Sequence, residues 1–360
     1  MIMRKKGISD ISIKKILIIQ TWCIGDILVV TAALKALRQK FPNARIDFLV
    51  SDKNRGREVL ENNPFVNNVL NSPKKGDSRY LFKRIFLFIR ILFANYQLVI
   101  DYSGNQDIAR YAIILSHAKY RLGFSCAKNA ALYNLKAENI KNNYEARRNI
   151  DILHMIDIQH KNSPLELYFY IKEQSMKKAD GWLFSNNINP EELIIFSPGS
   201  KLSSKAWNPY CYAALADAIV EKYDLKIAII NVPNERDAAI IMKNAMKKQA
   251  CLLEKMTFNE AAAFIKKAKL LICNDGGLNH LSAAVGTPSF AIFWPEGDPQ
   301  RWSPKGVSGH HYYLHNAEYA KDNMNSRNDT FGIAPEEAFK MVESIFEEIR
   351  DSSKSSELLR

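Results

Sequence analysis

Residues 270–293 read LLICNDGGLNHLSAAVGTPSFAIF, an apolar run, a glycine turn, a short helical pattern and a second apolar run. The spacing predicts a strand at Leu270 to Cys273, a helix at Leu278 to Val285 and a strand at Ser289 to Phe293. The turn Asn274 to His280 joins the first strand to the helix. Because glycines allow close approach to the backbone and a helix N-terminus attracts anions, this turn predicts a phosphate site.

The same alternation of strands and helices runs through most of the chain. In the first half it predicts strands at 15–20, 45–50, 66–70 and 98–101 and helices at 27–41, 58–61, 81–94 and 107–117. After a weaker stretch at 125–190, it predicts further strands at 193–196 and 226–231 and helices at 209–223, 235–247, 257–267 and 335–350. We therefore expect an α/β fold of two Rossmann-like domains facing a central cleft, with the ligand at the carboxyl ends of the strands. The expected boundaries are 1–170 and 171–350, followed by a frayed tail at 351–360.

Composition limits the classes of function. The 360 residues carry a net charge of +12, which suits phosphates, anionic lipid or nucleic acid as partners. Nucleic acid is the weakest of these, because the sequence has no arginine-rich tail, zinc-finger spacing or RNA-binding aromatic motif. The five cysteines are scattered without a CxxC pair, which favours a reducing cytoplasm over a disulfide framework. No signal-peptide pattern opens the sequence, and no apolar run reaches the roughly 18 residues of a membrane span.

The longest apolar segment is Leu81 to Phe93, LFKRIFLFIRILF, which Lys83, Arg84 and Arg90 interrupt. It fits either an amphipathic helix at a membrane surface or a helix packed on the core with a basic outer edge. We favour the core-packed helix, because burial of a helix face is the usual arrangement and a predicted strand follows at once.

Two further segments follow predicted strands. Asp26, after the turn TWCIG, suits either a helix N-cap or a general base that takes a proton from a sugar hydroxyl. Ser197 to Ser200 with Lys205 suits either an ordinary loop or a phosphate-binding turn with a cation. Neither segment has the GxGxxG spacing of a dinucleotide fingerprint, which disfavours a nicotinamide oxidoreductase.

Together these segments resemble the bacterial heptosyltransferases of lipopolysaccharide core synthesis, glycosyltransferase family 9 of the GT-B fold. The resemblance covers KILIIQTWCIGDILVVTAALKALRQKFPNARIDFLV, YQLVIDYSGNQDIARY and SPGSKLSSKAWNPYCYAALADAI. It is most specific in KMTFNEAAAFIKKAKLLICNDGGLNHLSAAVGTPSFAIFWPEGDPQRWSP, where order and spacing both agree.

The resemblance assigns residue roles. It implies that Asp26 is the catalytic base and that Lys205 steadies the donor phosphates and the leaving group. The remaining donor contacts that it implies are phosphate at Ser200, ribose at Glu235, adenine at the Met256 backbone, and pyrophosphate and sugar at Asp275, Gly276, Gly277 and His280. Two departures concern the donor sugar: Gly276 replaces a common Ser or Thr, and Trp294 replaces a small residue.

The resemblance implies an inverting transfer of heptose from ADP-heptose to the inner core of lipopolysaccharide or lipooligosaccharide. It needs no cofactor beyond this co-substrate, and the lack of a DxD motif predicts no metal. The acceptor would be a phosphorylated, lipid-anchored saccharide at the inner face of the cytoplasmic membrane. Five basic residues suit either contact with that acceptor or with anionic inner-membrane lipid, or an ordinary solvated basic face: Lys53, Arg55, Arg57, Lys83 and Arg84.

Three rival functions keep this fold: transfer of another nucleotide sugar in surface glycan synthesis, epimerisation of a nucleotide sugar, and non-catalytic nucleotide-sugar binding. Donor screening separates the first from heptosyl transfer. Release of free epimerised sugar without an acceptor identifies the second, and indifference to Asp26→Ala identifies the third.

Overall fold

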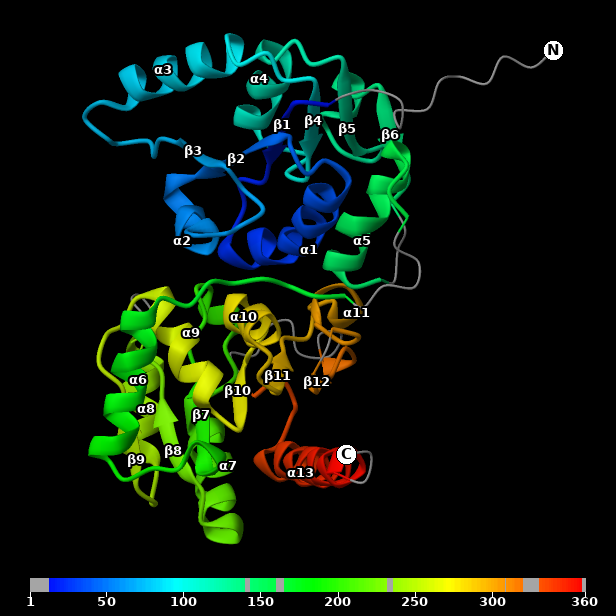
Figure 1. Ribbon diagram of the computed structural model, residues 1–360. Helices are drawn as coiled ribbons and strands as arrows, with labels where there is room; N and C mark the ends of the chain where they lie inside the picture. The colour runs from blue at the N-terminus through cyan, green and yellow to red at the C-terminus, as the bar shows by residue number, and fades with distance from the viewer. Residues whose placement is uncertain are drawn as a thin grey trace, which may run out of the picture. The chain divides into compact units, whose positions relative to one another are not determined.

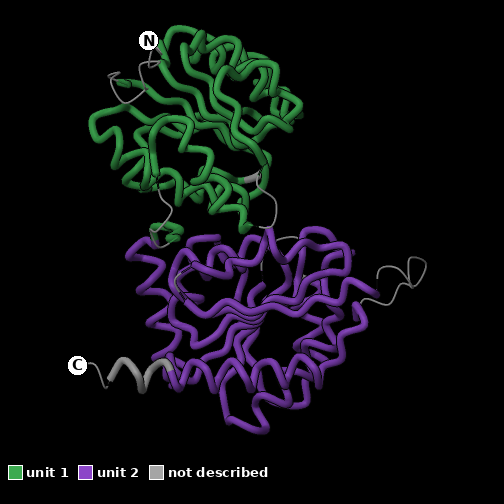
Figure 2. The backbone as a smooth tube through the Cα atoms, turned by 90° about the vertical axis from the view of Figure 1, so that its right-hand side faces the viewer, with its two compact units in different colours: residues 1–170 green, residues 171–360 purple. Residues whose placement is uncertain are grey.

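The protein is described by a computed structural model that covers residues 13–139, 143–159, 165–231, 236–307, 309–319 and 330–357. The chain divides into two compact units, residues 1–170 and 171–360 (Figure 2). Each unit contains a six-stranded sheet in which the neighbouring strands are parallel (Figure 1).

Unit 1 alternates strands with helices. Its strands are β1 Lys15–Ile19, β2 Arg45–Ser51, β3 Asn68–Ser72, β4 Leu98–Asp101, β5 Tyr120–Phe124 and β6 Leu135–Ala137. Its α-helices are α1 Ile24–Lys40, α2 Gly56–Leu60, α3 Tyr80–Leu92, α4 Asp107–Leu115 and α5 Glu145–Asp151. Short 3-10 turns are η2 Asp52–Asn54, η3 Ala130–Leu132 and η4 Ile152–Ile156.

Unit 2 repeats the alternation. Its strands are β7 Leu193–Ser197, β8 Lys226–Ile229, β9 Ala250–Leu252, β10 Leu270–Asn274, β11 Ser289–Phe293 and β12 His311–His315. Its α-helices are α6 Glu173–Ser185, α7 Pro209–Tyr223, α8 Arg236–Ala245, α9 Phe258–Lys267, α10 Gly277–Val285, α11 Pro299–Trp302 and α13 Pro335–Glu357. Its 3-10 turns are η5 Pro190–Glu192 and η6 Ser203–Lys205.

Strand order locates the ligand edge of each unit. The first sheet runs β3-β2-β1-β4-β5-β6, and the second runs β12-β11-β10-β7-β8-β9. In the first sheet β1 lies between β2 and β4, and in the second sheet β7 lies between β8 and β10. The loops that follow the two strands of the β1/β4 pair, and of the β7/β10 pair, therefore lead to opposite sides of the sheet. Such a switch point opens a crevice at the carboxyl ends of its two strands. The turns after β1, β4, β7 and β10 therefore border the predicted sites.

Burial explains why these strands form. All five residues of β7, β10 and β11 are buried, as expected for parallel strands that helices cover on both faces. In unit 2, one core joins side chains of the strands to Leu215 of α7, Met242 of α8 and Val342 of α13. In unit 1, a core on one face joins β1, β2 and β4 to α3 and α4, which lie side by side (Figure 1).

Several predicted boundaries change. Helix α1 begins at Ile24, three residues before the predicted start, and α13 ends at Glu357 rather than Arg350. The predicted cap of α9 is confirmed, because the Thr257 side chain accepts from Glu260 N at 3.2 Å while Glu260 Oε2 accepts from Thr257 N at 2.7 Å.

The expected basic outer edge of α3 is present, because Lys83 and Arg90 are exposed, but it makes up only part of the exposed surface of the helix. The helix packs on the core as predicted through Leu87 and Ile91, but its opposite face is exposed and mainly apolar. Periodicity indicated that one face is buried; it did not show that the helix has more apolar side chains than that face can cover.

Candidate functional site

The turns after β7 and β10 are tied together by one side chain, Asn274, the last residue of β10. Its Nδ2 donates to Pro198 O at 2.8 Å and Gly199 O at 3.1 Å. Its Oδ1 accepts from Trp207 N at 2.8 Å and Tyr212 Oη at 3.0 Å. The side chain is buried, so these bonds use both its donors and both its acceptor positions inside the fold. Asn274 therefore fixes the crevice at the switch point, a role that the sequence analysis did not assign.

Lys205, at the end of η6, lies beside the turn after β10. Its ammonium lies 4.6 Å from the centre of the Trp294 ring, on the loop after β11. Because β10 lies between β7 and β11 in the sheet, this contact brings Lys205 across the end of β10. Gly297 permits the loop geometry, since a Cβ there would lie 2.8 Å from the Trp294 carbonyl oxygen. The ring face therefore holds the ammonium beside the turn after β10, and it accepts no conventional hydrogen bond from it.

Asp275 lies in the same group. Burial raises the pKa of its carboxyl from 3.8 to about 6, the Lys205 ammonium opposes the rise, and Asp298 adds to it. The side chain is thus partly protonated near pH 6 and ionised at neutral pH. The turn therefore carries a cation and a carboxylate together, as a site that binds both phosphate and sugar hydroxyls requires.

His280 lies in the first turn of α10, as predicted, and its side chain is buried. Burial lowers the pKa of its imidazole to about 4, and the neighbouring His311 contributes. The ring is consequently neutral at physiological pH, and its centre lies 6.0 Å from that of Trp302. It can offer an N–H to a ligand oxygen, but it adds no positive charge.

Gly276 is the N-cap of α10, and its backbone is extended at φ 174°. A Cβ at this position would meet one atom within 4 Å, the Asn274 carbonyl oxygen at 4.0 Å. Neither backbone conformation nor packing within the chain therefore requires glycine. The open space lies beside the first N–H groups of α10, where the sequence predicted close approach of a phosphate.

The other predicted donor residues are placed less completely. Ser200 is half-buried on the loop after β7, next to the carbonyls that Asn274 binds. Met256 is buried between β9 and α9, at the same carboxyl edge of the sheet. No described contact joins it to Lys205 or Asp275. Glu235 lies outside the described residues.

In unit 1, Asp26 is the third residue of α1, and Cys23 is the N-cap. The interpretation of Asp26 as the N-cap is therefore wrong by three residues. Its Oδ2 accepts from Cys23 N at 3.1 Å, as the distal half of a capping box does. The capping and base roles are compatible, because this bond fixes a half-buried carboxylate at the end of β1.

A second buried network holds the turn that carries Asp26. Ser103 Oγ accepts from Thr21 N at 2.8 Å, and Trp22 Nε1 donates to Ser103 O at 2.9 Å. Asp101 Oδ1 in turn accepts from Ser103 N at 2.9 Å, and burial raises the pKa of that carboxyl. These bonds tie the turns after β1 and β4, so unit 1 repeats the arrangement that Asn274 makes in unit 2. No local pattern in the sequence marks Ser103 or Asp101 for this role.

Basic residues follow β2, the neighbour of β1. Lys53, Arg55 and Arg57 are exposed, and Arg55 donates to both carboxylate oxygens of Glu58. Gly56 brings this segment against α1, since a Cβ there would lie 2.4 Å from Ile27 Cδ1. Positive charge is therefore packed beside the turn of helix that carries Asp26.

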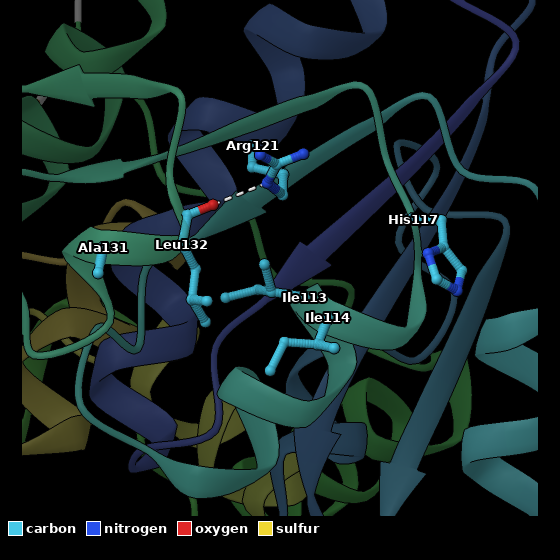
Figure 3. A pocket seen from close by; sticks show the side chains of 6 residues that line it. All are labelled: Ile113, Ile114, His117, Arg121, Ala131 and Leu132. Atoms are coloured by element: carbon cyan, nitrogen blue, oxygen red, sulfur yellow. Dashed lines mark hydrogen bonds between the residues drawn. The ribbon is translucent and has the colours of Figure 1, made fainter.

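A hollow of about 360 Å³ lies elsewhere in unit 1 (Figure 3). Its lining comes from α4, the turn after α4, β5 and η3: Ile113, Ile114, His117, Arg121, Ala131 and Leu132. Arg121 Nε donates to Leu132 O at 2.7 Å, the bond drawn in Figure 3. The hollow shares no residue with the turns after β1 or β10, so we do not assign it to the candidate site.

Among the described residues, no three His, Cys, Asp or Glu side chains gather into a group able to hold a metal ion. The described helices also include none that combines the length and apolarity needed to cross a membrane.

Two Rossmann-like units, each with a six-stranded parallel sheet and its own switch point, are the architecture of the GT-B class. The chain belongs to glycosyltransferase family 9 (heptosyltransferase), whose family model matches residues 85–331.

Individual comparisons agree with this family. Lipopolysaccharide heptosyltransferase 3 of Escherichia coli is 22% identical over 291 residues, which are 75% of this chain and 80% of that protein. The crystal structure of a family 9 glycosyl transferase from Veillonella parvula matches with a TM-score of 0.77 at 20% identity, covering 93% of this chain and 97% of that one. The E. coli heptosyltransferase WaaC with ADP-2-deoxy-2-fluoro heptose matches with a TM-score of 0.67 at 17% identity, covering 92% and 99%. Both crystal structures share the fold of this chain.

Proposed function

We propose that this chain transfers heptose from ADP-heptose onto the inner core of lipopolysaccharide or lipooligosaccharide. The observation that carries the proposal is the convergence of Lys205, Asp275 and the N-terminus of α10 at the switch point of unit 2. The E. coli relative with an ADP-heptose analogue supports the choice of donor.

The donor diphosphate binds at this convergence. The Lys205 ammonium neutralises its charge, and the backbone N–H groups at Gly276 and Gly277 add the positive end of the α10 dipole. Ser200 and neutral His280 donate hydrogen bonds to phosphate oxygens. These donors stabilise the charge that grows on the leaving nucleoside diphosphate as the glycosidic bond breaks.

The rest of the donor is recognised by three residues. Asp275 accepts from sugar hydroxyls as a carboxylate. The Met256 backbone contacts adenine and Glu235 holds the ribose, which are roles that the family resemblance implies. No cofactor is needed beyond the nucleotide sugar.

Asp26 is the general base. It accepts the proton of the acceptor hydroxyl as that oxygen attacks the anomeric carbon, and the nucleoside diphosphate leaves from the opposite face, so the configuration inverts. The bond from Cys23 N stabilises the ionised carboxylate and fixes its orientation.

The acceptor is a phosphorylated, lipid-anchored saccharide at the inner face of the cytoplasmic membrane. Lys53 and Arg57 are exposed beside the α1 turn that carries Asp26, and they attract the acceptor phosphates. The arginine paired with Glu58, Arg55, is less available for this contact.

Calorimetric titration with ADP-heptose, ADP-glucose, UDP-sugars and GDP-sugars tests the donor assignment. We expect ADP-heptose to bind the wild-type chain and Lys205→Ala to weaken binding by about 10-fold to 100-fold, the value of a hydrogen bond to a charged group. Lys201→Ala, on the same loop, is the matched control and should change affinity less than twofold. Binding of a UDP- or GDP-sugar in place of ADP-heptose would establish the rival donor and reject the heptosyl assignment.

A further inference from the structure

Helix α3 exposes an apolar face opposite the face that packs on the core. Leu87 and Ile91 are buried, whereas Phe82, Phe86 and Phe93 are 71%, 61% and 74% exposed. At 3.6 residues per turn, these phenylalanines lie on the side of the helix away from the buried pair. An exposed face of this kind on a chain that is otherwise well packed marks an interaction site.

The apolar face continues onto α4. Tyr111 and Ile114 of α4 are 46% and 47% exposed, and the rings of Tyr111 and Phe88 lie 5.8 Å apart. We call the combined set the α3 surface: Leu81, Phe82, Ile85, Phe86, Ile89, Phe93, Tyr111 and Ile114. Figure 1 shows α3 at the outer surface of unit 1 with α4 beside it.

Charge at the border of the α3 surface is positive. Helix α3 contains no acidic residue, and its Lys83 and Arg90 are exposed on one flank of the apolar face. Exposed cations continue into the preceding segment and α4: Lys74, Lys75, Arg79 and Arg110. The acid beside them, Asp77, forms an ion pair with Lys83 at 2.5 Å. A protein partner would have to match both the apolar face and its positive border. An anionic lipid interface matches both, because it has apolar chains beneath a negatively charged surface.

We propose that the α3 surface docks unit 1 onto an anionic phospholipid bilayer, with the phenylalanines at the boundary between headgroups and acyl chains. Lys83, Arg90 and Arg79 then lie among the headgroup phosphates. The helix lies in the interface plane, since it is too short to cross a bilayer. This proposal does not rest on the heptosyl assignment, because it concerns the lipid surface and not the donor.

The docking surface reaches the edge of the sheet that carries Asp26. A helix between two parallel strands runs antiparallel to them, so α3 begins near the carboxyl ends of the strands. Burial raises the pKa of the Asp52 carboxyl, directly after β2, and the nearby Lys83 ammonium opposes that rise. The basic end of α3 therefore lies beside η2, at the edge where the turn after β1 is found. Docking would bring this edge close to a lipid-anchored substrate.

Flotation of the full-length chain with vesicles tests the proposal. We expect binding to vesicles of phosphatidylcholine with about one-third phosphatidylglycerol, and much weaker binding to phosphatidylcholine alone. Phe82→Ser with Phe86→Ser should lower the apparent partition coefficient by about 30-fold or more, since each phenylalanine contributes close to a factor of ten when it leaves water. Arg79→Glu with Arg90→Glu should lower it only on the anionic vesicles.

Matched controls lie in unit 2. Phe184→Ser removes a phenylalanine that is 89% exposed, and Lys247→Glu with Lys340→Glu reverses two exposed cations. Both controls should float as the wild-type chain does. Phe86→Trp keeps the apolar character, and its emission should shift to the blue when anionic vesicles are added.

Three results would overturn the proposal. The first is a wild-type chain that does not float with anionic vesicles, and the second is an equal loss of binding in Phe184→Ser. The third is a dimer in sedimentation velocity that the Phe82→Ser and Phe86→Ser pair dissociates, without vesicle binding by the wild-type chain. That result would assign the α3 surface to a second copy of this chain.

Discussion

Replacing Asn274 with alanine should destabilise unit 2 and loosen the donor site together. The substitution removes four hydrogen bonds and leaves two buried donors, Trp207 N and Tyr212 Oη, without their acceptor. An unsatisfied buried donor costs about 1–3 kcal/mol. The Gly199 carbonyl is only partly buried and can bind water, so it adds little. We therefore expect a loss of about 3 kcal/mol in the free energy of unfolding, with at least a tenfold loss in ADP affinity.

Urea unfolding followed by tryptophan fluorescence measures the stability change, because four of the five tryptophans lie in residues 171–360. Asn186→Ala, at an exposed position in unit 2, is the control and should stay within about 0.5 kcal/mol of the wild-type chain. In the Asn274→Ala background, Tyr212→Phe should cost less than it does alone, since the orphaned hydroxyl is then removed. A loss below about 1 kcal/mol for Asn274→Ala, with additive effects of the two substitutions, would refute the central role of this side chain.

Three further changes test the site. The pKa of the His280 imidazole lies near 4 in the folded chain, below its ordinary value of 6.5. The contribution of this residue to the free energy of unfolding is therefore complete above pH 6.5 and falls as the pH drops towards 4. His280→Gln should remove up to about 3 kcal/mol of this pH dependence, measured by urea titrations at several pH values. The raised pKa of Asp275 acts in the opposite direction: its contribution is present below pH 3.8 and falls as the pH rises through 6, so Asp275→Asn should make the acid-side loss of stability larger by up to about 3 kcal/mol. An unchanged pH profile in either variant would contradict the assigned burial. Gly276→Ser should fold as stably as the wild-type chain or gain up to about 1 kcal/mol from the added N-cap hydroxyl, and a marked fall in thermal midpoint would show that glycine is required there.

Much of the fold follows from local pattern. Apolar runs such as Leu193 to Ser197 are fully buried strands, and the Thr257 capping box marks the start of α9 as predicted. The start of α1 was misplaced because Ile24 and Gly25 carry no periodic apolar signal, and a cysteine N-cap is unusual. Where an apolar pattern coincides with the buried face of a strand or helix, the sequence alone is sufficient to predict that element.

The site itself depends on contacts that no local pattern records. Lys205 could be predicted as a cation near phosphate, but its support by the Trp294 ring joins loops 89 residues apart in the sequence. Asn274 and Ser103 are ordinary polar residues at strand ends, and their roles depend on strand order. Likewise, the exposed face of α3 depends on how many helices cover one sheet face. The residue types alone indicated the chemistry of the candidate site, whereas the positions of its side chains could be known only from the fold.

Asp26 is the most direct test of the central claim, that this chain is a transferase whose base and donor site lie at the two switch points. The measurement is single-turnover transfer from ADP-heptose to a phosphorylated, lipid-linked core saccharide, with donor affinity measured in parallel. For Asp26→Asn we predict a transfer rate lower by about 100-fold to 10,000-fold, the range of general base catalysis, with donor affinity unchanged within twofold. Transfer by Asp26→Asn at the wild-type rate, or no transfer by the wild-type chain from this donor, would contradict the account.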